Sequence, residues 1–428
     1  KVMKKRILVA TLTATMASSI FGMTGNAAER ELNINWLSSR GTSDGVIMAI
    51  QDIAQQYQEE NPDLDFNFEI ETVAGHIAYL QKLKILAASD ELPEWFDSDP
   101  DSWFADIVAD GKAYSFDDLY KELGMDDQIF EISKEYARLS DGSLNLMTFQ
   151  CNTEYFFYNK DLFEQAGISE PPKTFDELLE DCKILQDADI LPITMGSDWP
   201  ILRYFAQIPF RMTGNAYIEN AVSGEGSFGE EAGLKGAQFI QDIAQYFQEG
   251  WSSADYDTMI DMFASGQAAI MYNATWALDQ ANMIGEDGNI KDSIGYFTMP
   301  TYSENDVTAP TDFFANSGIG TAIRTDAVDD EMKAWVKYML EHYADASLSY
   351  NLLPSVMPDE KTMEELPPVY QGIIENVSNM KSYAKCWDVV IDSALIEPLE
   401  KETVILALGQ ETPEEWAANM DECVKNQQ

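Results

Sequence analysis

The order of hydrophobic patterns constrains this chain most, because strand and helix patterns alternate along it. Residues 31–37 alternate apolar and polar side chains, which predicts a strand. Residues 46–60 then place apolar side chains on one helical face, and residues 64–70 alternate again. A helical pattern at 77–89 and a short apolar run at 92–96 complete the series. This order predicts an α/β layer architecture with a mostly parallel sheet.

The pattern restarts after residue 144, which predicts a second sheet. Residues 144–158 are rich in aromatic residues and are expected to be extended. Thr174 and Glu177 form a capping box at the start of the helix that follows. Further strands are expected at 190–193 and 270–272, and further helices at 201–221 and 230–248.

The charge balance excludes partners that require a basic surface. The chain carries 74 Asp and Glu against 27 Lys and Arg, for a formal net charge of −47. Such a surface repels the phosphates of nucleic acids and of anionic lipids. An acidic disordered chain is poor in apolar residues, whereas 45% of this chain is apolar and nine residues are tryptophan. We therefore expect a globular protein with an acidic surface and no nucleic-acid partner.

The first 28 residues have the layout of a secretory signal peptide. Four basic residues among the first six precede an apolar stretch at 7–23, and small residues follow at 25–28. An uncleaved membrane anchor is the alternative, but the stretch is short and rich in Thr and Ser. We expect an exported, extracytoplasmic protein, at the cell surface or in the periplasm. No cysteine at residues 20–28 is available for N-terminal lipidation.

The cysteines indicate neither a metal site nor a redox motif. They are scattered, without a CxxC pair or a zinc-ligand spacing. An exported protein permits disulfides, and four cysteines allow three pairings, so disulfides and buried free thiols both remain open. No metal or cofactor is expected. The four residues are Cys151, Cys182, Cys386 and Cys423.

Two glycine-rich motifs match enzyme motifs without the context that those motifs need. Residues 41–45 read Gly-Thr-Ser-Asp-Gly, but a nucleophile elbow places its serine directly after a strand and needs a partner histidine. The alternative is a helix cap formed by Ser43 or Asp44. Residues 224–229 match GxGxxG but follow a helix, whereas a dinucleotide site follows a strand.

Three acidic residues follow the apolar run at 92–96 and suggest a ligand site. Asp97, Asp99 and Asp101 resemble the start of a calcium loop, but its glycine and final glutamate positions hold Ser102 and Val108. In open α/β sheets, ligands bind beyond the carboxyl ends of the strands. Carboxylates there accept hydrogen bonds from sugar hydroxyls, and nearby tryptophans stack on pyranose rings. A solvated acidic turn is the alternative.

Five segments occur in a characteristic order along the chain. They are Leu-Pro-Glu-Trp-Phe at 92–96, Tyr-Asn-Lys-Asp-Leu-Phe-Glu-Gln-Ala-Gly at 158–167, Pro-Lys-Thr-Phe-Asp-Glu-Leu at 172–178, the stretch 263–276 that ends in Trp276, and Leu-Leu-Pro-Ser-Val at 352–356. Together they resemble the extracellular solute-binding proteins of bacterial ABC sugar importers, the family that includes maltose-binding protein.

The resemblance implies a periplasmic-binding-protein-like clam with two α/β lobes and three interlobe crossings near 148–151, 297–300 and 352–355. Lobe 1 would comprise 29–149 and 299–352, and lobe 2 would comprise 150–298 and 353–428. A monomer of this kind binds carbohydrate between its lobes, closes, and presents the closed form to a membrane permease of an ABC transporter. It is a receptor and not an enzyme.

The resemblance also implies which residues contact the ligand. Trp276 is similar to the family's stacking tryptophan, although a core tryptophan beside the strand at 270–272 is the alternative. Trp199 matches an aromatic residue that lines the cleft from the second lobe. The remaining positions are Trp36, Ser38 and Arg40 after the first strand, Asp99 and Asp101 after the third, Asn152 in a crossover strand, Phe313 and Asn316 before a strand that returns to lobe 1, and Trp387 at the cleft rim. Trp251, Trp335 and Trp416 are expected in the core.

The sequence leaves two alternatives to an oligosaccharide receptor. A receptor for a polyamine or a metal–chelate complex would fit the acidity, and a secreted hydrolase would use Ser43 or a pair of carboxylates. Members of the family usually have Gly-Ser directly before the stacking tryptophan, whereas this chain has Ala274 and Thr275. The identity of the sugar is therefore not carried over from the resemblance.

Overall fold

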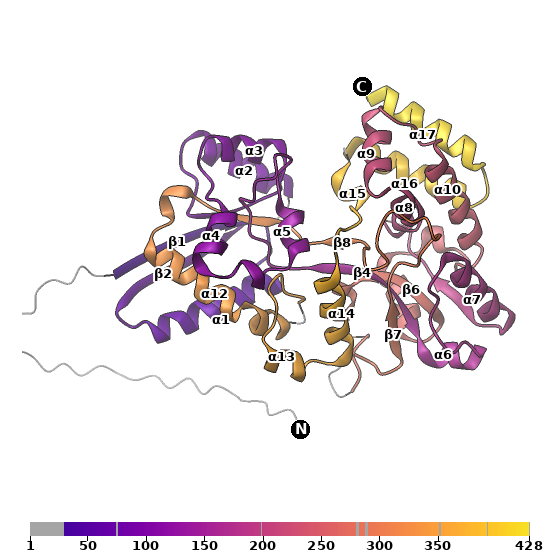
Figure 1. Cartoon of the computed structure of the whole chain (residues 1–428), viewed down its shortest axis with the longest axis horizontal. Coiled ribbons are helices and arrows are strands. Elements are labelled where there is room, and N and C mark those ends of the chain that lie inside the picture. The colour runs from indigo at the N-terminus through magenta and orange to yellow at the C-terminus, as the bar shows by residue number, and fades with distance from the viewer. Residues whose placement is uncertain are drawn as a thin grey trace, which may run out of the picture.

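A computed structural model describes residues 30–73, 76–197, 199–279, 282–286, 290–350, 352–391 and 393–427. The expected signal peptide at 1–28 lies outside these residues. Figure 1 shows two bodies side by side, each with its own sheet, joined by extended segments near β4 and β8. We call the body that holds β1 lobe 1 and the body that holds β4 lobe 2.

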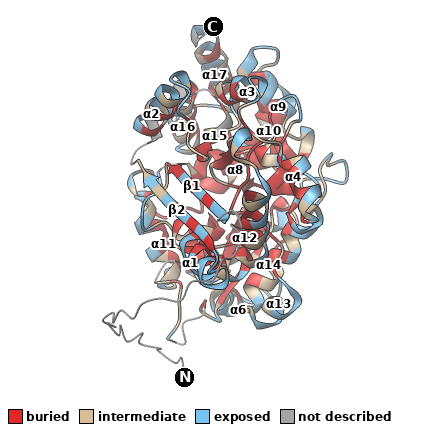
Figure 2. Ribbon diagram, turned by 90° about the vertical axis from the view of Figure 1, so that its left-hand side faces the viewer, coloured by how far each residue is buried: buried red, intermediate tan, exposed pale blue. Residues whose placement is uncertain are grey.

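The sheet of lobe 1 has the strand order β2-β1-β3-β9. Strand β1 runs parallel to β2 and β3, while β9 returns antiparallel to β3. Figure 2 shows exposed and buried residues alternating along β1 and β2, because helices α1 and α12 pack together over one face. The strands are β1 (Arg30–Ser38), β2 (Leu64–Thr72), β3 (Trp95–Ser98) and β9 (Gly320–Ile323), and the helices are α1 (Gly45–Glu60), α2 (His76–Ala88), α3 (Ser102–Ala109), α4 (Phe116–Leu123), α5 (Glu131–Ala137) and α12 (Asp330–Leu348), with 3₁₀ turns η1 (Asp126–Gln128) and η4 (Thr325–Ala327).

The sheet of lobe 2 has the order β5-β6-β4-β7, and β8 pairs with the start of β4. Its strands are β4 (Asn152–Asn159), β5 (Leu191–Thr194), β6 (Ala268–Ala274), β7 (Ile294–Phe297) and β8 (Ala315–Asn316). Its helices are α6 (Lys160–Ala166), α7 (Phe175–Asp187), α8 (Pro200–Thr213), α9 (Ala216–Ser223), α10 (Glu231–Ala244), α11 (Tyr256–Ala264), α13 (Glu360–Glu365), α14 (Pro368–Asn379), α15 (Trp387–Val390), α16 (Ser393–Ala407) and α17 (Pro413–Gln427), with 3₁₀ turns η2 (Trp251–Ser253) and η3 (Thr275–Asp279).

The α/β class with two sheets is confirmed, but lobe 2 departs from a mostly parallel sheet. Strand β4 runs antiparallel to both β6 and β7, and only β5 and β6 are parallel within this sheet. The reason is the path of the chain. Strand β4 enters lobe 2 from the connection at Asn152, whereas β6 runs back and ends at Ala274 opposite Glu154.

Several local predictions are confirmed with shifted limits. Thr174 and Glu177 make the expected capping box on α7. The helix expected at 201–221 is two helices, because Gly214 between them has a φ of +66°. The strand expected at 92–96 begins only at Trp95.

Two of the chain's passages between the lobes run side by side. Gln150 forms an antiparallel bridge with Pro354, and the Cys151 amide donates to the Leu353 carbonyl at 3.1 Å. A third passage lies between β8 and β9, which belong to different sheets. The family resemblance implied this passage at 297–300.

The segment between β7 and β8 stays with lobe 2 because a buried arginine binds it. The Arg211 guanidinium donates to the carbonyls of Met299, Pro300 and Ala309, with distances of 2.6 to 3.0 Å. Burial lowers the pKa of Arg211 to about 10. We therefore propose that the third division between the lobes falls after β8 and not at 297–300.

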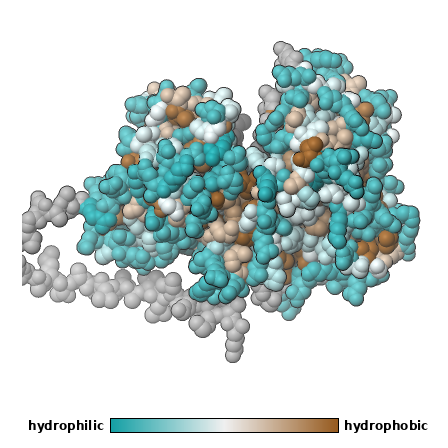
Figure 3. All heavy atoms as spheres, in the orientation of Figure 1, coloured by the Kyte–Doolittle hydropathy of each residue, from teal (hydrophilic) through white to brown (hydrophobic). Residues whose placement is uncertain are grey.

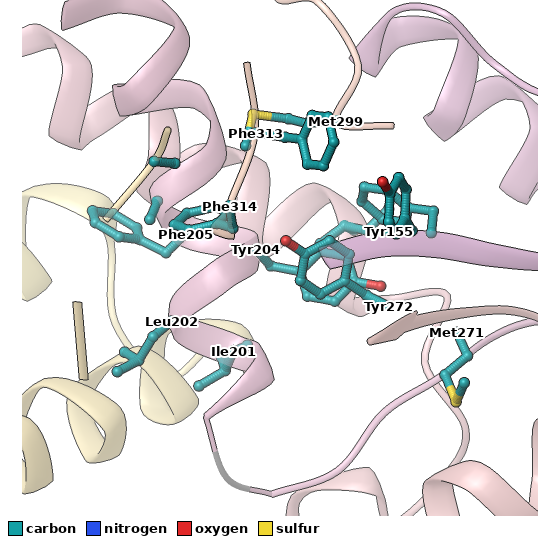
Figure 4. Packing of buried hydrophobic residues seen from close by; sticks show 14 of the residues in the cluster. Tyr155, Ile201, Leu202, Tyr204, Phe205, Met271, Tyr272, Met299, Phe313 and Phe314 are labelled. Atoms are coloured by element: carbon teal, nitrogen blue, oxygen red, sulfur yellow. The ribbon is translucent and has the colours of Figure 1, made fainter. Parts of the chain in front are cut away.

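Each lobe has its own buried core. Trp36, Trp95 and Trp335 are fully buried around the sheet of lobe 1, whereas Trp251 and Trp416 are buried in lobe 2. The core positions expected for Trp251, Trp335 and Trp416 are confirmed. Figure 4 shows part of the aromatic interior of lobe 2, with Tyr204 and Tyr272 on α8 and β6. All four cysteines are free thiols, three of them buried.

Candidate functional site

An open notch separates the two lobes above the connecting segments (Figure 3). Helix α5 of lobe 1 and helix α15 of lobe 2 lie on opposite sides of it (Figure 1). At its base, the ring of Tyr136 from α5 lies 5.9 Å from the ring of Tyr383, which precedes α15. Burial raises the pKa of Tyr136, and nearby negative groups, including Asp99 of lobe 1 and Asp388 of lobe 2, add to the increase. These residues therefore mark where the two lobes meet.

Two partly exposed tryptophans of lobe 2 form an edge-to-face pair. The ring centroids of Trp199 and Trp276 are 5.9 Å apart, with an interplanar angle of 70°. Trp276 lies in η3, directly after β6, and Trp199 is the residue before α8. The sequence predicted both residues for one site, and the structure brings them together from positions 77 residues apart.

Hydrogen bonds fix the orientation of Trp276. Its indole Nε1 donates to the Tyr256 hydroxyl at 3.0 Å, and that hydroxyl lies 3.2 Å from Oδ1 of Asn273. Thr275, beside the tryptophan, donates to Oδ1 of Asn152 at 3.3 Å and so ties η3 to the start of β4. An aromatic face held in one orientation is suited to stacking on a flat apolar ligand face such as that of a pyranose.

A buried ionic network lies behind Trp199. The guanidinium of Arg203 donates through Nε to both carboxylate oxygens of Glu154, at 2.9 and 3.0 Å, and through Nη1 to Asp388. It also lies 5.1 Å from the centre of the Trp199 ring. Burial lowers the pKa of Arg203, but the negative groups around it raise that pKa well above its usual value. The network therefore holds a permanent cation under the tryptophan.

In lobe 1, Asp97 is the centre of a second buried network. Its carboxylate accepts hydrogen bonds from the Trp36 indole at 2.9 Å, the Ser38 hydroxyl at 2.7 Å, the Arg40 guanidinium at 2.8 Å and the Thr321 hydroxyl at 2.7 Å. Trp36 and Ser38 are fully buried. Their predicted contact with ligand is not available in this conformation, because both side chains point into the interior to bind Asp97.

Arg40 links the carboxyl end of β1 to the third passage between the lobes. Its Nη2 donates to the carbonyl of Ile319 at 2.5 Å, and its guanidinium lies over the rings of Trp36 and Phe149 at 5.7 and 5.5 Å. Only 8% of its side chain is exposed. Its charge is compensated by Asp97. In this conformation Arg40 therefore stabilises the connection between the lobes.

Asp99 and Asp101 follow β3 on the lobe 1 side of the notch. Asp101 is exposed and caps α3, with its carboxylate accepting from the Phe104 amide at 2.9 Å. Asp99 is partly exposed, and its negative charge contributes to raising the pKa of Tyr136. Across the connection, Asn152 and Asn316 are paired in β4 and β8, and both are partly exposed.

The side chains of Phe313 and Trp387 do not reach the notch. Phe313 is 1% exposed and packs on Tyr155 at 5.1 Å, within the interior drawn in Figure 4. Trp387 is 4% exposed and packs edge-on to Phe205 at 4.9 Å. Both predictions therefore assigned a core residue to the ligand site. The sequence position of an aromatic residue near a cleft does not determine whether its side chain points toward that cleft.

Five polar residues near the junction of the lobes were not predicted from the sequence. Arg203 and Glu154 occur in apolar stretches, so the pattern predicts them only as parts of a helix and a strand. The available indication was a charged residue within an otherwise apolar stretch, because a buried charge needs a partner. Tyr136 and Asp388 belong to short helices, and Tyr383 lies in the segment before α15, so none of the three lies in a periodic pattern.

The motifs whose spacing resembles that of enzyme motifs have structural roles at helix ends. Asp44 caps α1 by accepting from the Val46 amide at 2.8 Å, and Gly224 ends α9 with a φ of +77°. Within the described residues, no three His, Cys, Asp or Glu side chains are grouped so that they could hold a metal ion. In the same part of the chain, no helix combines the length and apolarity needed to span a membrane.

A depression of about 560 Å³ lies elsewhere, on lobe 1 between β1, β2 and α2. Its two basic residues are each paired with an acid of the same lining, Lys82 with Glu71 and Arg324 with Glu94, and Glu69 and Glu91 add two further carboxylates. Glu94 also accepts from the Asn35 amide at 3.0 Å. The Trp199–Trp276 pair, in contrast, offers partly exposed aromatic faces.

Comparison with known proteins assigns the family. The family model of the bacterial extracellular solute-binding proteins matches residues 46–344. This chain belongs to that family. The maltotriose-binding protein of Pyrococcus abyssi (strain GE5 / Orsay) is 26% identical over 271 residues, which are 59% of this chain and 54% of that relative. The match thus spans about half the length of this relative.

Solved structures of solute-binding proteins share the fold across nearly the whole chain. A chitin oligosaccharide binding protein superposes with a TM-score of 0.68 at 23% identity, covering 92% of this chain and 98% of that one. A probable secreted solute-binding lipoprotein from Streptomyces coelicolor gives a TM-score of 0.75 at 14% identity, covering 94% and 100%. RafE in complex with raffinose gives 0.62 at 16% identity, covering 92% and 99%. At these identities the likeness concerns the fold.

Proposed function

We propose that this solute-binding protein is an extracytoplasmic receptor for a carbohydrate, in particular an oligosaccharide. The sugar would bind in the notch between the lobes, and closure would bury it and present the closed form to the permease of an ABC transporter. The proposal includes export and function as a monomer, and it assigns no catalytic step or cofactor.

The Trp199–Trp276 pair is the observation that carries this proposal. Two partly exposed indoles, one held by Tyr256 and the other lying against Arg203, form an aromatic surface on lobe 2, which Thr275 ties to Asn152 at the connection between the lobes. Pyranose rings present apolar C–H faces and polar edges, and they match an aromatic surface rimmed by carboxylates and amides. The named relatives support the same ligand class, since their names refer to maltotriose, chitin oligosaccharide and raffinose.

Isothermal titration calorimetry of the full chain tests the proposal. The panel comprises maltotriose, xylotetraose, chitotriose, raffinose and galactose, with spermidine as the probe for a polyamine receptor. We expect at least one sugar to bind with a dissociation constant in the micromolar range or below. Binding of spermidine with no response to any sugar would replace the carbohydrate proposal with the polyamine alternative.

Delivery to a transporter needs its own test. The receptor is added to proteoliposomes that contain a candidate ABC transporter, with the labelled sugar outside, and ATP-dependent uptake is measured. We expect uptake only when both receptor and sugar are present. Equal uptake without the receptor would contradict the proposed role in delivery.

A further inference from the structure

The geometry points to Asp388 as a residue that determines ligand specificity, by selecting uncharged sugars over sugars that carry a carboxylate. Arg203 and Glu154 are positioning residues that hold Asp388 and Trp199 in place. This inference rests on the proposed function and names the class of sugar that the same site accepts.

Asp388 lies beside the aromatic pair and reaches solvent. Its side chain is 21% exposed, on a short helix at the lobe 2 side of the notch (Figure 1). Its Oδ1 accepts from Nη1 of Arg203, whose guanidinium lies over Trp199. Among the residues that the structure describes, Oδ2 of Asp388 has no recorded donor. One carboxylate oxygen is thus fixed, and the other can accept from a ligand hydroxyl.

The charges of this region leave a net negative wall. Arg203, which lies 5.1 Å from the centre of the Trp199 ring, bridges two carboxylates, those of Glu154 and Asp388. On the lobe 1 side, the charge of Arg40 is compensated by Asp97. Asp99 adds a further negative charge, and both Asp99 and Asp388 contribute to raising the pKa of Tyr136. On the lobe 2 side, the single charge of Arg203 is therefore shared by two carboxylates.

This imbalance discriminates between ligand classes. A sugar hydroxyl donates a charge-assisted hydrogen bond to a carboxylate, which strengthens as closure removes water. A uronic acid instead places a like charge in the same partly buried space, where Coulomb repulsion is poorly screened. Neutral oligosaccharides should therefore bind more tightly than the same oligosaccharides with one hydroxymethyl group oxidised to a carboxylate, or with a uronic acid attached at one hydroxyl.

Calorimetry with matched sugar pairs tests the inference. The pairs are xylotetraose against glucuronosyl-xylotetraose, and maltotriose against maltotriose oxidised to a uronate at one C6. We expect the neutral member of the pair that binds to be favoured at least tenfold. Asp388→Asn should reduce this preference at least threefold, whereas Glu219→Gln, which removes an exposed carboxylate paired with Lys385 nearby, should preserve it.

The positioning role is tested separately with Arg203→Lys. Lysine keeps the charge but cannot bridge Glu154 and Asp388 with a planar fork. We expect a weaker affinity and a changed near-ultraviolet circular dichroism signal from the Trp199–Trp276 pair at unchanged far-ultraviolet signal. An unchanged aromatic signal with unchanged affinity would overturn the positioning role.

The outcomes separate this inference from the proposed function. Equal affinity of the wild type for both members of a pair, or an unchanged preference in folded Asp388→Asn, would overturn the specificity role while the sugar receptor stands. Failure of every neutral sugar to bind would overturn the proposed function and the inference together.

Discussion

Replacing Trp276 with alanine probes the aromatic surface most directly. The indole is partly exposed, packs edge-to-face with Trp199 at 5.9 Å, and donates to Tyr256 at 3.0 Å. Truncation removes the ring that would stack on the ligand, while strand β6 before it and the core beneath it remain.

The expected loss follows from the area of one ring face. A tryptophan buries up to about 250 Å² in total, so one face offers roughly 100 Å² to a ligand. At about 25 cal/mol per Å², covering that face contributes roughly 2.5 kcal/mol. Because the edge contact with Trp199 occupies part of the ring, we expect a loss of about 2 kcal/mol, which is roughly 30-fold in the dissociation constant.

Calorimetry with the sugar that binds the wild type most tightly measures this loss. Trp276→Phe is the matched control, since it keeps an aromatic face and should lose roughly threefold to tenfold. Thermal unfolding of both variants verifies that they fold. An affinity within twofold of wild type in folded Trp276→Ala would refute stacking at this residue and favour the alternative that Trp276 is structural.

Three further predictions concern stability. The buried Glu154 pairs with Arg203, so Glu154→Gln should lower the unfolding free energy by about 3 kcal/mol, measured by urea denaturation, and an unchanged midpoint would contradict this account. Burial raises the pKa of Asp181 from 3.8 to about 6, so between these pH values the folded carboxyl keeps a proton that the unfolded chain has lost, and its contribution to stability falls as the pH rises from about 4 to 6. Asp181→Asn should therefore raise the melting temperature more at pH 7 than at pH 4. An equal change at both pH values would contradict the assignment. A Cβ at Gly233 would lie 2.0 Å from a tyrosine hydroxyl and 2.2 Å from a backbone carbonyl, so Gly233→Ala should cost roughly 1–3 kcal/mol, whereas Gly41→Ala has open space and should be neutral; equal melting temperatures for the two variants would disprove the packing argument.

Periodic and capping patterns predicted most of the fold because they depend on local sequence. The strand at 31–37 and the helix at 46–60 lie within one residue of β1 and α1, and the Thr174–Glu177 box is formed. The direction of β4 relative to β6 could not be read locally, since it depends on how the chain enters lobe 2. The position of the third passage likewise depends on Arg211 binding distant carbonyls.

The sequence predicted the site residues whose aromatic rings are partly exposed. It was less successful where tertiary packing determines whether a ring is exposed or buried. Trp199 and Trp276 were identified and lie together. Trp36 and Trp387 have the same residue type but are turned into the interior, and only tertiary packing determines that direction. Asp388, adjacent to Trp387, is partly exposed, and no pattern within a four-residue helix distinguishes the two residues.

A crystal structure of the protein with its tightest-binding sugar would show where the ligand lies. We expect a pyranose ring stacked on Trp276, a sugar hydroxyl within hydrogen-bond distance of Asp388, and contacts from both lobes. A sugar bound instead in the 560 Å³ depression between β1, β2 and α2, with the notch empty and open, would contradict this expectation.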